Sequence, residues 1–164
     1  KKVENSSLDK FFPPLSSTTK RSELKRLVRQ VGGRSNEVAK NAIDELRFMN
    51  LHTGKNSLLQ GAYLRRANLT GAYLQDANLS EANLQGTNLT KANLFDANLQ
   101  GAFLLDADLS GANLTYADLR GADLWMANFD EETILPDMSK WNAETELERF
   151  TDPNHPDFWE TDER

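Results

Sequence analysis

The chain has 164 residues, enough for one domain with a sizeable hydrophobic core, and it contains no cysteine. Disulfide bonds and thiolate metal sites are therefore excluded, and no apolar run approaches the roughly 20 residues of a membrane-spanning helix. The net charge of -6 is unevenly distributed, because residues 1–35 carry nine Lys and Arg side chains against three carboxylates.

The N-terminal domain, residues 1–56, is predicted to consist of a basic lead and two helices. The stretch TTKRSELKRLVRQVGG has apolar residues at helical spacing and ends at two glycines, which stop a helix. The stretch SNEVAKNAIDELRFMN has a second apolar face that needs burial. We expect this second helix to cap the N-terminal end of the next domain, over Leu59 and Leu64, through three side chains: Ile43, Leu46 and Met49.

The basic lead bears on cellular location. The sequence begins with Lys1 rather than methionine, as expected if an upstream segment is missing. Lysine and arginine next to a membrane stay on its cytoplasmic side. We therefore expect a cytoplasmic protein, held at the cytoplasmic face of a membrane if such a segment precedes the lead. A solvated helix face is the favoured interpretation of the same charges, and the membrane tether is the alternative.

The second domain, residues 57–136, repeats with a period of five. A central apolar residue recurs from Leu59 to Leu124, and Phe129 and Ile134 are taken as the last two of sixteen centres. The residue two places before the centre is alanine in thirteen units, the exceptions being Ser57, Thr87 and Glu132. Asn or Asp usually precedes the centre, and Gly often closes the unit.

A period of five is explained by two inward-facing positions and a corner. Residues two apart in an extended segment point to the same side, so the small residue and the centre both face inward. The remaining residues turn the chain, and the frequent glycine suits a corner with positive φ. An α-helix is excluded because a step of five residues rotates by about 140° and would scatter the leucines. The pattern predicts short strands that wind around an apolar core, represented by Leu79, Leu99, Leu119 and Phe129.

Two polar features of the array have simple structural interpretations. Thr87 stands at an inward position, so its hydroxyl is expected to bond to a backbone carbonyl. The column of asparagines before the centres could form a binding surface. We favour the alternative, in which stacked amide side chains hydrogen-bond from coil to coil.

The A-N-L-x-x array resembles that of the pentapeptide-repeat proteins. The resemblance implies an all-β repeat fold, a right-handed, four-sided (quadrilateral) β-helix. With four units per coil the array makes about four coils, a rod of roughly 20 Å. The segments LVRQVGGRSNEVAKNAIDEL and TILPDMSKW resemble the flanks of cyanobacterial members.

The third domain, residues 137–164, is predicted to be a capping helix over WNAETELERF and an acidic tail with aromatic residues. Chemistry is not expected in any of the three domains. The two histidines, His52 and His155, lie outside the array, and no Ser/His/Asp order, phosphate loop or metal spacing is present. The sequence therefore predicts a protein that is not an enzyme and that needs no cofactor or metal.

One outer face of the array carries a group of apolar residues. With four units per coil, residues twenty apart stack on the same face, which brings together Phe103, Leu105, Trp125 and Met126. A contiguous apolar patch is usually covered or is a contact site. We first expect the tail to fold back over the patch with four aromatic residues: Trp141, Phe150, Phe158 and Trp159. A partner protein or a second copy of the chain is the other interpretation, and a monomer is favoured over a dimer.

The sequence thus favours a non-enzymatic protein-interaction or scaffold module with an unidentified protein partner. The family resemblance implies an alternative, a DNA mimic that modulates a type II topoisomerase. The carboxylates of the array are spread over all faces and diluted by asparagine, which disfavours mimicry. Nucleic acid is not expected as a partner, because no stacking aromatic residues are interleaved with the basic lead.

Overall fold

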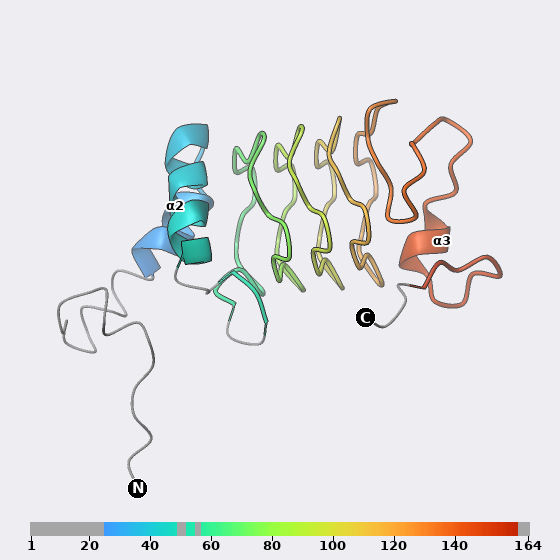
Figure 1. Cartoon of the computed structure of the whole chain (residues 1–164), viewed down its shortest axis with the longest axis horizontal. Coiled ribbons are helices and arrows are strands. Elements are labelled where there is room, and N and C mark those ends of the chain that lie inside the picture. The colour runs from blue at the N-terminus through green and yellow to red at the C-terminus, as the bar shows by residue number, and fades with distance from the viewer. Residues whose placement is uncertain (1–24, 49–51, 55–56, 161–164) are drawn as a thin grey trace, which may run out of the picture.

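The computed structural model of the protein describes residues 25–48, 52–54 and 57–160. Short coils stack along one axis, with helices at both ends (Figure 1). Residues 25–31 are helical, α2 spans Asn36–Phe48 and α3 spans Glu148–Thr151. None of the helices in these ranges has the length and apolar character that a bilayer span requires.

Parallel bridges hold neighbouring coils together. They run from the pair Tyr63 and Asn83 to the pair Asp108 and Asn128, and each joins a residue to the equivalent residue four units later. The chain therefore returns to the same side of the coil after every four units. Each strand of the described coils is a single bridged residue, because the rest of each unit turns the corner.

Leucine and alanine fill the inside of the coils. The central leucines from Leu59 to Leu119 are at most 2% exposed. The predicted core residues Leu79 and Leu99 are fully buried, whereas Phe129 is half-buried and stacks on Trp141 with ring centroids 6.1 Å apart. The apolar axis is therefore closed along most of the array and less completely covered at its C-terminal end.

Thr87 is buried among these alanines and leucines. Its hydroxyl donates a hydrogen bond of 2.8 Å to the carbonyl of Leu64, which confirms the prediction of a backbone partner. A buried hydroxyl without a partner would be costly, so this bond makes threonine tolerable at an alanine position.

The corners share one backbone conformation. From Gly61 to Met126, the residue two places after each centre has positive φ, between 61° and 68° at the glycines and between 54° and 61° elsewhere. Glycine adopts this conformation freely, whereas an L residue in the same conformation lowers the stability by on the order of 1 kcal/mol. The frequent glycine of the sequence is thus explained, and the same corner also forms where side chains are larger.

The asparagine column of the described coils does not form the amide ladder that the sequence suggested, and that prediction is wrong. Instead, Asn and Asp side chains accept a hydrogen bond from the amide two residues later in their own corner. Examples are Asn98 to Gln100 at 2.9 Å and Asn113 to Thr115 at 3.0 Å. Such local turns are the ordinary use of Asn and Asp, because the short side chain reaches its own backbone before it reaches the next coil.

The repeat changes register in its last unit, so the predicted centre at Ile134 is also wrong. Ile134 bridges Asn113, whereas an unbroken step of four units would bring Thr133 to that place. Leu135 is the buried residue, and Thr133, fully buried, takes the inward position that was assigned to Glu132. One residue has been added to the unit, and each later position is displaced by one.

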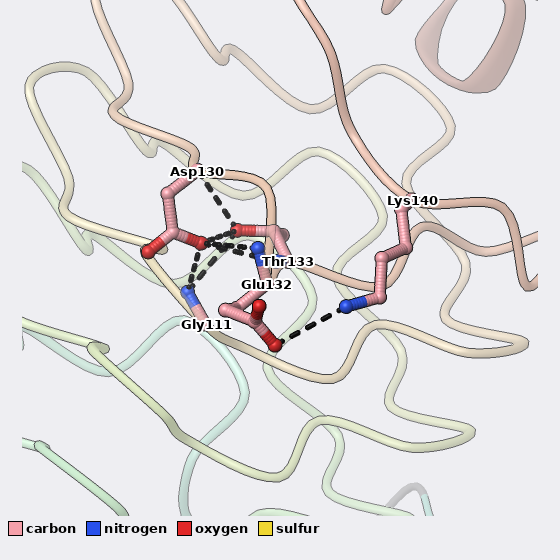
Figure 2. A network of polar contacts seen from close by, with 5 residues as sticks. All are labelled: Gly111, Asp130, Glu132, Thr133 and Lys140. Carbon is pink, nitrogen blue, oxygen red and sulfur yellow. Dashed lines mark hydrogen bonds and ion pairs between the residues drawn. The ribbon is translucent and has the colours of Figure 1, made fainter.

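Figure 2 shows how the added residue is accommodated. The Asp130 carboxylate accepts hydrogen bonds from the amide of Gly111 at 2.7 Å and from the amides of Glu132 and Thr133 at 3.0 Å. The Gly111 amide thus donates to a side-chain oxygen. The equivalent amides of earlier corners donate to a backbone carbonyl of the next coil, as that of Gly101 does to Arg120. Glu132 points outward and pairs with Lys140 at 3.1 Å.

The N-terminal helices lie across the first coil (Figure 1) and occupy part of its backbone edge. The Asn36 amide group of α2 donates to the carbonyl of Thr70 at 2.8 Å. The Arg47 guanidinium donates to the carbonyl of Tyr73 at 2.9 Å. The first coil therefore does not present a bare strand edge on these sides.

The predicted helical cap residues lie as follows. Ile43 and Leu46 of α2 are buried and belong to the same hydrophobic core as the central leucines, whereas Met49 lies outside the described residues. On the neighbouring side, the His52 carbonyl accepts from the Asn78 amide at 2.7 Å. The part of the N-terminal domain that the structure describes thus joins the coils through both apolar burial and backbone pairing.

Candidate interaction surface

The apolar patch of Phe103, Leu105, Trp125 and Met126 lies on one side of the last two coils. The bridge between Phe103 and Asp123 places its members on adjacent coils of that side. Phe103 is 52% exposed, Trp125 is 70% exposed and Met126 is 67% exposed, whereas Leu105 is half-buried. Three of the four predicted patch residues therefore present large apolar surfaces to the outside.

The described part of the C-terminal tail, residues 137–160, does not cover this patch, so the first expectation for its aromatic residues is wrong. Trp141 stacks on Phe129 at the end of the core. Phe150 is 2% exposed and contacts Trp159, with ring centroids 6.1 Å apart. The register change at Asp130 directs the chain across the end of the coils, where these aromatic residues find core residues to cover.

Two carboxylates lie next to the uncovered patch. Asp106 and Asp123 are exposed beside it. Residues 121–160 contain eleven Asp and Glu side chains against two basic ones. Arg120, in the preceding corner, is engaged by Asp118, whose hydrogen bonds raise the pKa of the guanidinium. The C-terminal end of the described chain therefore carries a net negative charge.

Two groups outside the patch have displaced pKa values. Burial, with the nearby positive charge of Arg47, lowers the pKa of His52, and its Nδ1 has no hydrogen-bond partner. The backbone amide of Gly111, with further bonds from Thr133 and Glu132, lowers the pKa of Asp130. Both groups sit at junctions of the coil with its flanks, and each is explained by its structural surroundings.

The described residues contain no group of His, Asp and Glu side chains that could hold a metal ion. His52 is buried beside the first coil, and the Nδ1 of His155 accepts the amide of Asp157 at 3.2 Å. The structure does not bring either histidine together with the patch. The sequence grouped the patch residues, and the placement of the described tail shows that Trp125 and Met126 stay exposed.

The repeat of this chain is shared with known proteins. A family model for pentapeptide repeats matches residues 57–94 and 92–130, in eight copies. A solved pentapeptide repeat protein from Nostoc is 30% identical, and the match covers 65% of this chain and 88% of that one, with a TM-score of 0.37. The chain belongs to the pentapeptide-repeat family. No curated protein matches it.

Two further solved structures are similar to this pentapeptide-repeat protein. One, from the cyanobacterium Cyanothece, is 36% identical over 49% of this chain and 58% of that one, with a TM-score of 0.43. The other, from the thylakoid lumen of Arabidopsis thaliana, is 30% identical over 51% and 61%, with a TM-score of 0.33. The chain thus spans less than two thirds of the length of these two relatives. The family resemblance, including cyanobacterial neighbours, is confirmed.

Proposed function

We propose that this pentapeptide-repeat protein is a non-enzymatic interaction or scaffold module, and that the apolar patch of Phe103, Leu105, Trp125 and Met126 is its contact surface. The observation that carries the proposal is the exposure of Trp125 and Met126. By contrast, aromatic residues of the C-terminal segment pack in pairs, Trp141 on Phe129 and Phe150 on Trp159. An exposed apolar group of this kind marks a contact site when the chain itself does not cover it.

The proposal includes the finer form of the fold, a right-handed, four-sided β-helix of about four coils with helices capping its N-terminal end. The bridges join residues four units apart, which supports four units per coil. A rod of stacked coils is suited to holding a surface patch at a fixed place, because the patch residue Phe103 is bridged to Asp123 of the next coil.

Affinity capture from the source cell tests the proposed contact surface. The bait is the full chain, and the variant Trp125→Ala removes the most exposed aromatic residue of the patch. Tyr73→Ala is the matched control, since Tyr73 is 58% exposed on another side of the coils. A protein captured by wild type and by Tyr73→Ala but lost with Trp125→Ala supports the proposal. Equal capture by all three places the contact elsewhere.

The topoisomerase alternative finds less support in the charges. A DNA mimic needs an ordered line of negative charge, and the corners of the described coils mix glycine and the basic residues Arg66 and Lys91 with the carboxylates. We expect the purified protein to leave the supercoiling of DNA by a type II topoisomerase unchanged. Inhibition at stoichiometric protein would favour mimicry instead.

The proposed location is the cytoplasm, at the cytoplasmic face of a membrane if a segment precedes the basic lead. Most of that lead, residues 1–24, lies outside the described residues. The exposed Lys25 and Arg29 of the first helical segment extend its positive charge.

A further inference from the structure

One side of the last coil has backbone hydrogen-bonding groups without partners. On the same side one coil earlier, the amides of Leu104 and Asp106 donate to the carbonyls of Asp123 and Trp125 at 2.8 and 3.1 Å. The amide of Asp123 in turn donates to the carbonyl of Ala102 at 3.0 Å. These three bonds are the complete pairing between two coils on this side.

The equivalent groups one coil later are the amides of Leu124 and Met126 and the carbonyl of Ala122. Within the described part of the chain, none of the three has a hydrogen-bond partner. Leu124 is also half-buried, whereas Leu104 is fully buried one coil before it. The segment 122–126 is therefore an open strand edge with part of the core accessible beside it.

The chain occupies parts of the other sides of this end with its own residues, although the amides of Leu119 and Phe129 also have no hydrogen-bond partner in the described part of the chain. The antiparallel bridge of Ile134 with Lys140 pairs one side. The carbonyl of Thr151 accepts from the amide of Gly121 at 2.7 Å on another. An uncovered strand edge is a liability that proteins usually block. The edge at 122–126 has no bond to the C-terminal segment, whereas the sides at Gly121 and Ile134 each have one.

We propose that the edge 122–126 binds an extended, basic peptide segment of a partner protein by strand addition. One amide of the peptide donates to the Ala122 carbonyl, and two of its carbonyls accept from Leu124 and Met126, repeating the pairing of the coil before. An apolar side chain of the peptide packs on Trp125. This inference rests on the proposed function as an interaction module and specifies its partner.

The charges favour a basic peptide over a second copy of the chain. The exposed Asp123 lies within the edge, and residues 121–160 hold eleven carboxylates against two basic side chains. Two copies that met through this edge would bring these acidic ends together, which opposes association. The N-terminal end of another copy offers little free edge, because Asn36 and Arg47 occupy carbonyls of its first coil.

The test uses the ¹⁵N-labelled full chain and a short synthetic peptide of alternating lysine and valine. We expect the peptide to slow hydrogen exchange at the amides of Leu124 and Met126 by about tenfold at saturation, and to bind less tightly as salt rises. Two control peptides separate the causes. One alternates glutamate with valine, and the other is the basic peptide methylated at the amides that face the edge. Neither is expected to protect the two amides.

Two variants check the side chains. Trp125→Ala should weaken the binding of the basic peptide by about tenfold. Tyr63→Ala should leave it unchanged, since Tyr63 is 68% exposed on the same side but at the opposite end of the coils. Matching thermal midpoints of both variants and wild type show that a loss of binding is not a loss of fold.

Several results would overturn the strand addition. These are unchanged exchange at Leu124 and Met126 with the peptide bound, equal protection by the acidic peptide, or protection that arises from dimers of the protein alone. Failure of this inference differs from failure of the proposed function. If the two amides stay unprotected while Trp125→Ala still abolishes capture of a cellular partner, the patch is a contact site and only strand addition is wrong. If Trp125→Ala changes neither measurement, both are wrong.

Discussion

Replacing Leu99 by alanine tests the inward packing of the array. Leu99 is fully buried, and the bridges of Asn98 place it between Leu79 and Leu119 in the neighbouring coils. The change removes three carbon atoms, which lose about 2.4 kcal/mol of transfer free energy at about 0.8 kcal/mol each. The backbone around the site is bonded on both sides, from the Leu99 amide to the Asp118 carbonyl at 2.8 Å and from the Asn98 amide to the Ala77 carbonyl at 2.9 Å.

Because these walls are held by hydrogen bonds, the cavity cannot collapse, and its cost adds to the transfer term. We therefore expect Leu99→Ala to lower the free energy of unfolding by about 3–4 kcal/mol. The measurement is urea denaturation followed by circular dichroism, with the slope compared between variants. The matched control is Leu105→Ala, which removes the same atoms from a half-buried outer position and should cost about 1 kcal/mol. Equal losses for the two variants, or a loss below about 1.5 kcal/mol for Leu99→Ala, would refute the inward packing.

Further predictions concern the corners, the buried threonine, the two displaced pKa values and the N-terminal end. Gly61→Ala should cost about 1 kcal/mol through backbone conformation alone, because nothing lies within 4 Å of the added methyl group, and Gly61→Asn should cost less, as urea midpoints would show. Thr87→Val should lower stability by about 1 kcal/mol in the same assay, since it keeps the shape but removes the bond to Leu64; a gain would contradict this account. The stability that the lowered pKa of Asp130 contributes is present at neutral pH and is lost in acid, as pH falls through the pKa of the folded state, so the thermal midpoints of wild type and Asp130→Asn should converge as pH falls. The lowered pKa of His52 disfavours its protonation in the folded state, so wild type should lose stability as pH falls below the ordinary value of 6.5, and His52→Gln should lose less. Deletion of residues 1–52 should cause association visible by light scattering, because it uncovers the edge of the first coil; a monomeric deletion variant would count against the cap.

The sequence predicts the interior of this fold well, because its period is strict. Leu79 and Leu99 could be assigned to the core from spacing alone. A hydrogen bond from Thr87 to a backbone carbonyl could be predicted because a hydroxyl at an inward position is out of reach of water. The patch residues Trp125 and Met126 could be grouped once four units were assigned to a coil. These inferences succeed because one repeating geometry fixes every position in the array.

Structural features that interrupt the five-residue period cannot be predicted from that period. The register change depends on the Asp130 carboxylate taking the Gly111 amide, and the sequence DEETIL also fits an unbroken step of five. The same register change determines where Trp141 lies, so the prediction that the tail folds over the patch is wrong. The open edge at 122–126 could not be foreseen for the same reason, since it is defined by where the tail does not go.

The four-unit spacing of the bridged partners has a consequence for how such a chain can lengthen. Duplicating a single unit of five would rotate everything after it by a quarter of a coil relative to α2. The patch around Trp125 would then face a new direction, although every unit still packed correctly. Only the gain or loss of four units together shifts the patch along the axis without turning it. The direction in which the patch faces therefore depends on the number of units modulo four. Inserting one unit of five residues into the array before the patch would turn the patch to another side, while each unit kept its own packing.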